Sequence, residues 1–320
     1  MLRMERAALR ASGRAPATER AYESDWLDFM AWCRSAGRVA LPATADTVGL
    51  YVCGLSRAGK LPATIARRLA AISERHARLG HASPVTPDVR EILAGIRRRV
   101  GAAPRHAKAA LTVEELRRLL AAIDGRTVRR GVYEWEAPGG AARAARDRAI
   151  LLVGFASGLR RSELAALELR DVEVAAAGLV IRIPRSKTDQ EGAGQEISVH
   201  RGRRRETCPV RAYEAWLVER GRAAGALFCR VSAAGAVEPS KHMRGDAIAL
   251  VVKSACERAG LDPDRYGGHS LRAGMCTAAA EHGARELAIM ARSRHSSVEM
   301  VRRYVRHGTV FAVDPLAGVL

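Results

Sequence analysis

Residues 268–304 read GHSLRAGMCTAAAEHGARELAIMARSRHSSVEMVRRY, and four polar side chains recur in this stretch at short intervals. His269 and Arg272 are three residues apart, so they share one face of a helix. His295 precedes Tyr304 by nine residues. The spacing of the apolar residues predicts helices near 269–281, 284–291 and 297–305. Helices of this kind can gather two histidines, an arginine and a tyrosine into one site.

Two segments nearer the N-terminus add further candidates. Gly158-Leu159-Arg160 forms a turn that leads into a helix, and Ser186-Lys187-Thr188 stands at the end of a predicted strand. His-x-x-Arg alone is a weak signal, because it occurs often by chance. The ordered set of all these segments is specific.

Together these segments resemble the tyrosine recombinase (phage integrase) family. Its pattern is an arginine after Gly-Leu, a strand lysine, His-x-x-Arg, a His or Trp, and a tyrosine about nine residues on. The match covers most of 142–306, and about 15–100 resembles the family's core-binding domain. The sequence departs from the pattern at Arg294, where many relatives have glycine. The residues that match, and that the resemblance implies are catalytic, are Arg160, Lys187, His269, Arg272, His295 and Tyr304.

The resemblance implies a DNA strand-exchange reaction in which Tyr304 attacks a phosphodiester. Negative charge then gathers on the non-bridging oxygens, and the forked guanidiniums of Arg160 and Arg272 suit its stabilisation. His269 and His295 can add donors or assist proton movement. The attack would leave a covalent 3′-phosphotyrosine and a free 5′-hydroxyl. Because that bond keeps the phosphate-ester energy, we expect neither a cofactor nor a metal.

Lysine is scarce in this chain, with five lysines against 53 − 5 = 48 arginines. A leaving 5′-oxygen needs a proton, which lysine can release near neutral pH and arginine cannot. Lys187 is the one lysine between residues 109 and 240, and it stands where the family places its general acid. A solvated charge at a strand end is the alternative.

Each of the other candidates also has a structural interpretation. Arg160 could simply pair with Glu163, which we interpret as supporting the site rather than reacting. The His-x-x-Arg pair could be a polar helix face. His295 could be a residue at a helix start, because Ser296 and Glu299 form a capping box after it. Tyr304 could be an aromatic residue at the edge of the core.

The net charge of +19 and the pI near 10.8 indicate an anionic partner. Residues 1–109 hold 19 Lys and Arg against 9 Asp and Glu, and the remainder holds 34 against 25. Both parts are therefore basic, which predicts that both contact double-stranded DNA. A GC-rich genome's preference for arginine is the alternative source of this charge.

The predicted fold is mainly α with a small antiparallel sheet. We expect a helical core-binding domain with its linker at 1–109 and a mixed α/β catalytic domain at 110–320. The linker, 102–110, is short and basic, and Thr112 with Glu115 forms a capping box after it. Residues 124–141 break the helical pattern and predict an exposed excursion. Alternating apolar runs at 169–174, 179–183 and 196–200 predict the sheet.

The first domain shows helical periodicity. Thr18 is placed to cap the first helix, and Leu-Pro-Ala-Thr at 41 and at 61 marks two helix starts. His76 lies on an apolar stripe and is expected to pack rather than bind a ligand. A further helix is expected from Pro87 to Val100. Helices near 209–220 and 243–259 are expected in the second domain.

The six cysteines are scattered without CxxC spacing, so we expect buried thiols in a reducing cytoplasm. No stretch approaches the roughly 18 apolar residues of a membrane span. The N-terminus lacks the apolar run of a secretory signal. These features predict a cytoplasmic protein.

The resemblance implies a homo-tetramer on paired DNA sites, with C-terminal segments exchanged between neighbours. Residues 307–320 could serve as that segment, or could pack on their own domain. No additional N-terminal arm-binding domain is expected. Three other functions stay open: a type IB topoisomerase, a DNA-binding protein without catalysis, and a metal-dependent nuclease or transposase. The last would need a carboxylate cluster, and Asp262, Asp264 and their neighbours form no convincing set.

Overall fold

The computed structural model describes residues 16–101, 108–124, 127–130, 133–136, 140–184 and 194–309. The chain forms two compact units, Met1–Arg105 and His106–Leu320, which are described separately below. Lys187 and most of the predicted tail, 310–320, lie outside the described residues. No helix in the described ranges is long and apolar enough to cross a membrane.

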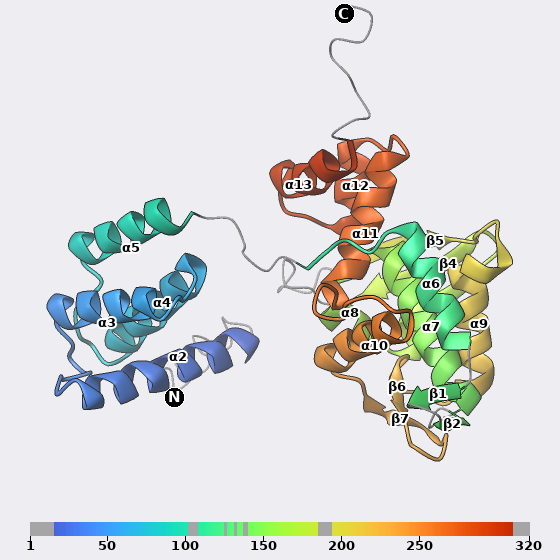
Figure 1. Ribbon diagram of the computed structural model, residues 1–320, viewed down its shortest axis with the longest axis horizontal. Coiled ribbons are helices and arrows are strands. Elements are labelled where there is room, and N and C mark those ends of the chain that lie inside the picture. The colour runs from blue at the N-terminus through green and yellow to red at the C-terminus, as the bar shows by residue number, and fades with distance from the viewer. Residues whose placement is uncertain are drawn as a thin grey trace, which may run out of the picture. The chain divides into compact units, whose positions relative to one another are not determined.

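The first unit is a set of helices around one apolar core (Figure 1). Helix α2 packs against α4, and α3 packs against α5. The helical spacing of the apolar side chains produces this arrangement, because each helix turns one stripe inward. The helices are α2 (Pro16–Ser35), α3 (Ala45–Arg57), α4 (Pro62–Arg78) and α5 (Pro87–Val100).

The two Leu-Pro-Ala-Thr repeats do start helices, but in different ways. In the first, Thr44 is the N-cap of α3, and its hydroxyl accepts from the Thr47 amide at 3.2 Å. In the second, Pro62 is the first helical residue, where its missing N–H costs nothing. The predicted cap at Thr18 is wrong, because α2 already begins at Pro16.

His76 is fully buried, and both of its ring nitrogens are hydrogen-bonded. Its Nδ1 donates to the Ile72 carbonyl at 2.8 Å, and its Nε2 accepts from the Ala43 amide at 2.9 Å. Burial lowers the pKa of His76, which keeps the ring neutral. This histidine therefore joins α4 to the segment before α3, as a packed residue.

The second unit is built around α7, which packs against α6, α9 and α11 (Figure 1). Helix α11 also packs against α12 and α13, so it links the central helix to the C-terminal helices. The predicted capping box before α6 is present: Thr112 and Glu115 exchange bonds of 2.8 and 3.1 Å. The helices are α6 (Val113–Asp124), α7 (Gly140–Ser157), α8 (Arg161–Ala166), α9 (Pro209–Arg220), α10 (Gly245–Arg258), α11 (Gly268–Glu281), α12 (Glu286–Ser293) and α13 (Val298–Thr309).

The predicted antiparallel sheet is present, with strand order β3-β4-β5. Its strands are β3 (Val172–Ala175), β4 (Gly178–Ile183) and β5 (Gln195–His200). Alternation along β4 and β5 places the cross-strand pairs Leu179–Val199 and Ile181–Ile197 in the core, and β5 packs on α7 and α9. The first predicted strand begins too early, because Leu169–Asp171 forms a 3₁₀ turn before β3.

Two hairpins were not expected from the sequence. Strands β1 (Thr127–Arg130) and β2 (Tyr133–Glu136) pair within the predicted excursion at 124–141. Strands β6 (Cys229–Val231) and β7 (Val237–His242) form the second hairpin. In the second hairpin, β6 has only three residues and β7 includes Pro239, which is uncommon inside strands, so no periodic pattern marked it.

The structure corrects two further expectations. The thiol of Cys53 is exposed, whereas the other cysteines are buried as predicted. The predicted capping box after His295 is replaced by another contact. Helix α13 begins at Val298, and the Ser296 hydroxyl is directed at the sulfur of Met300, 3.6 Å away.

Candidate active site

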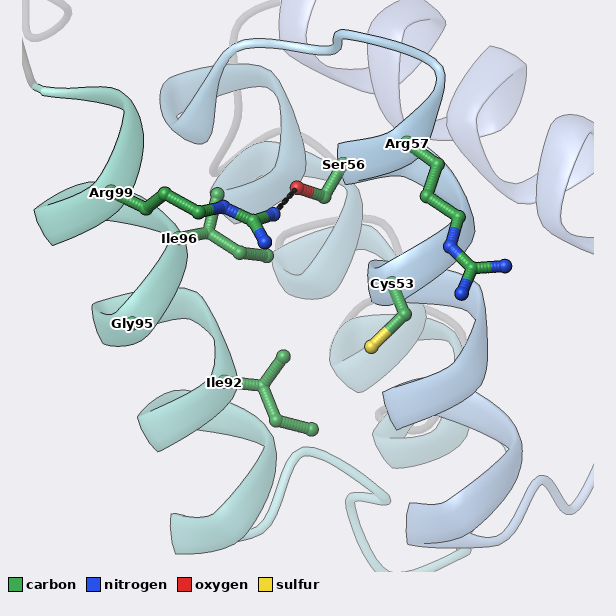
Figure 2. Close-up of a pocket in the computed structure, with 7 residues that line it drawn as sticks. All are labelled: Cys53, Ser56, Arg57, Ile92, Gly95, Ile96 and Arg99. Atoms are coloured by element: carbon green, nitrogen blue, oxygen red, sulfur yellow. Dashed lines mark hydrogen bonds between the residues drawn. The ribbon is translucent and has the colours of Figure 1, made fainter.

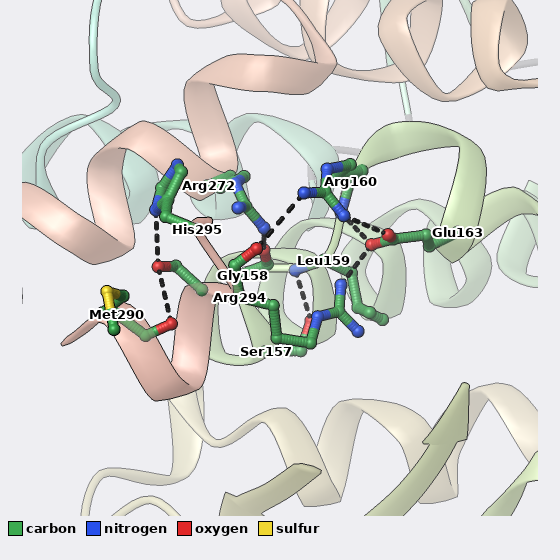
Figure 3. A network of polar contacts seen from close by, with 10 residues as sticks. Ser157, Gly158, Leu159, Arg160, Glu163, Arg272, Met290, Arg294 and His295 are labelled. Carbon is green, nitrogen blue, oxygen red and sulfur yellow. Dashed lines mark hydrogen bonds and ion pairs between the residues drawn. The ribbon is translucent and has the colours of Figure 1, made fainter. Parts of the chain in front are cut away.

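Five of the six sequence-predicted site residues come from three segments that the second unit brings together, and Figure 3 shows Arg160, Arg272 and His295. Arg160 lies in the turn between α7 and α8, and His269 and Arg272 lie on the first turns of α11. His295 lies between α12 and α13, and Tyr304 lies on α13. Because α11 packs against both α7 and α13, residues up to 134 positions apart in the sequence are in contact here.

Tyr304 and His269 are in direct contact. The tyrosine hydroxyl lies 2.9 Å from Nε2 of His269, a hydrogen-bond distance. Tyr304 is half-buried against a small apolar cluster, and the fully buried Val301 anchors the same face of α13. The His295 ring lies 5.6 Å from the tyrosine ring, centroid to centroid. The hydroxyl thus faces a histidine while the ring packs on its own unit.

Arg272 is the most deeply placed cation of the site, with 2% of its surface exposed. Its Nη1 donates to the Gly158 carbonyl at 2.7 Å (Figure 3). Burial, with a smaller effect of Arg160, lowers the pKa of Arg272 to about 10. The guanidinium is therefore still charged at neutral pH, and its position is fixed by a backbone oxygen.

Arg160 is held by hydrogen bonds to the Glu163 carboxylate and to the Arg294 carbonyl. Its Nη1 donates to Glu163 Oε1 at 2.7 Å, and its backbone amide donates to Glu163 Oε2 at 2.8 Å. Its Nη2 donates to the Arg294 carbonyl at 3.2 Å. The pairing with Glu163 that the sequence suggested is present. It orients a half-buried guanidinium next to Arg272.

Both histidines of the site are neutral near pH 7. Burial, followed by the charges of Arg272 and Arg160, lowers the pKa of His269 even though its side chain is partly exposed. The same causes, in the same order, lower the pKa of the buried His295 to about 4. A neutral imidazole has one nitrogen free to accept a proton, which a protonated one lacks.

The tautomer of His295 is linked to Ser293, a residue that the sequence analysis missed. The Ser293 hydroxyl donates to the Ile289 carbonyl at 2.7 Å and lies 2.6 Å from Nδ1 of His295. A hydroxyl has one proton, so while it is donated to Ile289 the oxygen accepts from Nδ1–H. His295 Nε2 then carries the free lone pair. Nothing in the sequence pattern marked this serine.

Lys187, the sixth predicted residue, lies outside the described residues. Within the described ranges, no three His, Cys, Asp or Glu side chains gather as a possible metal site. Away from the site, the first unit has an open groove between α3 and α5 (Figure 2). Arg57, Cys53 and Arg99 line it, and Arg99 Nη2 donates to the Ser56 hydroxyl at 2.9 Å.

Comparison with known proteins places this geometry in a family. The Phage integrase family profile matches residues 109–309. An "Integrase/recombinase xerD homolog" of Selenomonas ruminantium is 33% identical over 98% of this chain and 89% of its own length.

Solved structures of low sequence identity share the fold. The Tn1549 transposon integrase in complex with transposon right end DNA has a TM-score of 0.63 at 15% identity, over 97% of each chain. A lambda integrase dimer bound to a COC′ core site has a TM-score of 0.60 at 15% identity, over 95% of this chain and 93% of that one. The chain therefore belongs to the phage integrase family of tyrosine recombinases, site-specific enzymes that cleave and rejoin DNA.

Proposed function

We propose that Tyr304 is the nucleophile that cleaves DNA in this recombinase. The observation that carries the proposal is the 2.9 Å contact between the Tyr304 hydroxyl and His269 Nε2. The phenolic oxygen attacks the scissile phosphorus, and its proton passes to the neutral His269. The bond from phosphorus to the 5′-oxygen breaks. The products are a 3′-phosphotyrosine and a free 5′-hydroxyl.

Arg160 and Arg272 stabilise the negative charge that develops on the non-bridging oxygens. Their adjacent positions support this role, as does the fixed geometry that Glu163 and the Gly158 carbonyl impose. A guanidinium has five N–H donors, of which the contact of Arg272 with Gly158 uses one. His295 has an unprotonated Nε2 in the tautomer that Ser293 favours, so we propose that it assists proton movement next to the phosphate.

Lys187 is proposed as the general acid that protonates the leaving 5′-oxygen. The support comes from the sequence, where it is the one lysine between residues 109 and 240. A 5′-bridging phosphorothioate tests this role, because a thiolate leaves without being protonated. Lys187→Ala should cleave ordinary DNA slowly and the phosphorothioate at nearly the wild-type rate. Slow cleavage of both substrates would assign Lys187 another role.

We further propose that a core-binding domain, 1–109, and a catalytic domain, 110–320, close around duplex DNA. Both domains carry excess positive charge, and Arg57 and Arg99 line a groove in the first unit that a phosphate could approach. Phosphate contacts should dominate the affinity, so binding should weaken steeply with salt. The active assembly is proposed to be a homo-tetramer on paired sites, with residues 307–320 exchanged between neighbours.

A suicide substrate tests the nucleophile. Nicked duplex carrying the cognate site is mixed with wild type or Tyr304→Phe, with EDTA present. We expect a covalent protein–DNA adduct from the wild type alone. If both proteins bind a verified site and neither forms an adduct, the chain binds DNA without cleaving it. If the adduct forms but only supercoils are relaxed, a topoisomerase is the better description.

A further inference from the structure

Arg294 has an unusual backbone for an arginine. It ends α12 with φ 54° and ψ 47°, in the left-handed region that favours glycine. It is the one non-glycine residue with positive φ in the described ranges. This chain therefore makes a glycine-like turn with a residue that has a long cationic side chain.

That side chain turns inward rather than toward solvent. It is 6% exposed, and its Nη2 donates to Glu163 Oε2 (Figure 3). Among the described residues, its Nε and Nη1 are buried without a hydrogen-bond partner. A buried arginine with unpaired donors is costly, which calls for a compensating role.

Glu163 is shared between two arginines. Its Oε1 accepts from Arg160 Nη1, and its Oε2 accepts from the Arg160 amide and from Arg294 Nη2. The Arg294 carbonyl also accepts from Arg160 Nη2 at 3.2 Å. Arg294 therefore acts on Arg160 in two ways. Its carbonyl contacts Arg160 directly, and its side chain acts through Glu163.

We propose that Arg294 is a positioning residue that balances the charge of Glu163 and so leaves Arg160 available to the scissile phosphate. This inference rests on the proposed role of Arg160. With Arg294 present, the Arg160–Glu163–Arg294 group carries one net positive charge. Without it, the buried carboxylate neutralises Arg160 alone, and the attraction of Arg160 for the phosphate weakens.

The proposal predicts a specific pattern of kinetics for three variants. Arg294→Met keeps the bulk without the charge, and Arg294→Gly relieves the left-handed backbone as well. Both should lower the single-turnover cleavage rate at saturating DNA by about tenfold. Arg294→Lys, which keeps the charge, should recover most of that loss. Glycine adopts the left-handed backbone without strain, so a lower cleavage rate of Arg294→Gly cannot be assigned to a misfolded turn.

Three readouts separate positioning from a direct DNA contact or a purely structural effect. The salt dependence of DNA binding should stay unchanged, because the loss of a direct phosphate contact would reduce its slope by about one. In a Glu163→Gln background, Arg294→Met should have less than about a threefold effect on cleavage, because its route to Arg160 is already lost. Arg292→Met is the matched control, since Arg292 donates to the Ala156 carbonyl, 3.2 Å away. Its effect should be equal in both backgrounds.

Several outcomes would overturn this inference. One is cleavage by Arg294→Met at the wild-type rate, and another is a smaller slope of DNA affinity against salt. A third is an equal loss of cleavage rate from Arg294→Met with and without Glu163→Gln. The last is an effect of the Arg292→Met control that also disappears in the Glu163→Gln background. All are read against a wild type that forms the adduct. If neither the wild type nor Arg294→Met forms the adduct, the proposal that Tyr304 is the nucleophile is refuted. If the wild type forms it, the rates of the variants test the role of Arg294 alone.

Discussion

Gly158 offers the sharpest test of how the fold positions the site. It has φ +63°, and its carbonyl accepts from Arg272 Nη1. A Cβ at this position would lie 2.3 Å from Cε of Met275, while the nearest backbone atom, Ser293 Cα, is 3.8 Å away. The substitution Gly158→Ala therefore meets a conformational cost and a clash with one flexible side chain.

The magnitude follows from these two contributions. The left-handed conformation costs an L-residue about 1–2 kcal/mol, and crowding the buried Met275 adds about 1–3 kcal/mol. We expect Gly158→Ala to lower the free energy of unfolding by about 2–5 kcal/mol. Displacing the carbonyl that holds Arg272 should also slow cleavage by about tenfold.

Calorimetry of the full chain measures the first effect, and the suicide substrate measures the second. Gly158→Ala, Met275→Ala and the double variant form a cycle in which the double variant should lose about 1 kcal/mol less than the sum. A free energy of unfolding within about 0.5 kcal/mol of the wild type would refute the reasoning for Gly158→Ala. If the losses of the two single variants simply add in the double variant, the Met275 side chain moves aside without an energetic cost.

The remaining predictions concern the histidines. Because the pKa of His269 is lowered below its usual 6.5, its neutral form persists as the pH falls. Cleavage at subsaturating DNA should stay constant from pH 8 to 6.5, then fall about tenfold per unit below that pKa. Ser293→Ala removes the hydroxyl 2.6 Å from His295 Nδ1 and should slow cleavage about tenfold at unchanged DNA affinity, measured by fluorescence anisotropy. His76→Ala leaves the Ala43 amide without its acceptor and opens a cavity, so calorimetry should show a loss of about 2–4 kcal/mol, reduced in His76→Gln.

Opposite results would count against each of these. A cleavage rate that rises on acidification would mean that His269 acts as a protonated donor. As a control, the fall in cleavage rate at low pH should be absent in His269→Gln. Equal cleavage by Ser293→Ala and wild type would show that the tautomer of His295 does not matter. A His76→Ala protein as stable as the wild type would mean that the first unit readjusts around the missing ring.

Local patterns predicted much of the fold because they depend on near neighbours. The Thr112–Glu115 capping box formed as expected, since both partners lie within one turn. Alternation predicted that Ile181 and Ile197 face the core, because side chains in a strand alternate with period two. The same dependence explains a failure at the second hairpin, since β6 spans only three residues and Pro239 interrupts β7.

The order of the motifs alone determined the family and named Arg160, His269, Arg272, His295 and Tyr304 as one set, because side-chain chemistry is written directly in the sequence. Their contacts were decided by tertiary structure. The 2.9 Å approach of Tyr304 to His269 exists because α11 packs on α13, and no local spacing encodes it.

Arg294 shows most clearly what could not be predicted from the sequence. In sequence it was a departure from a glycine, and only the fold directs its guanidinium to Glu163, 131 residues away. Contacts this distant depend on how helices pack, because the energy of a buried charge is set by everything that surrounds it.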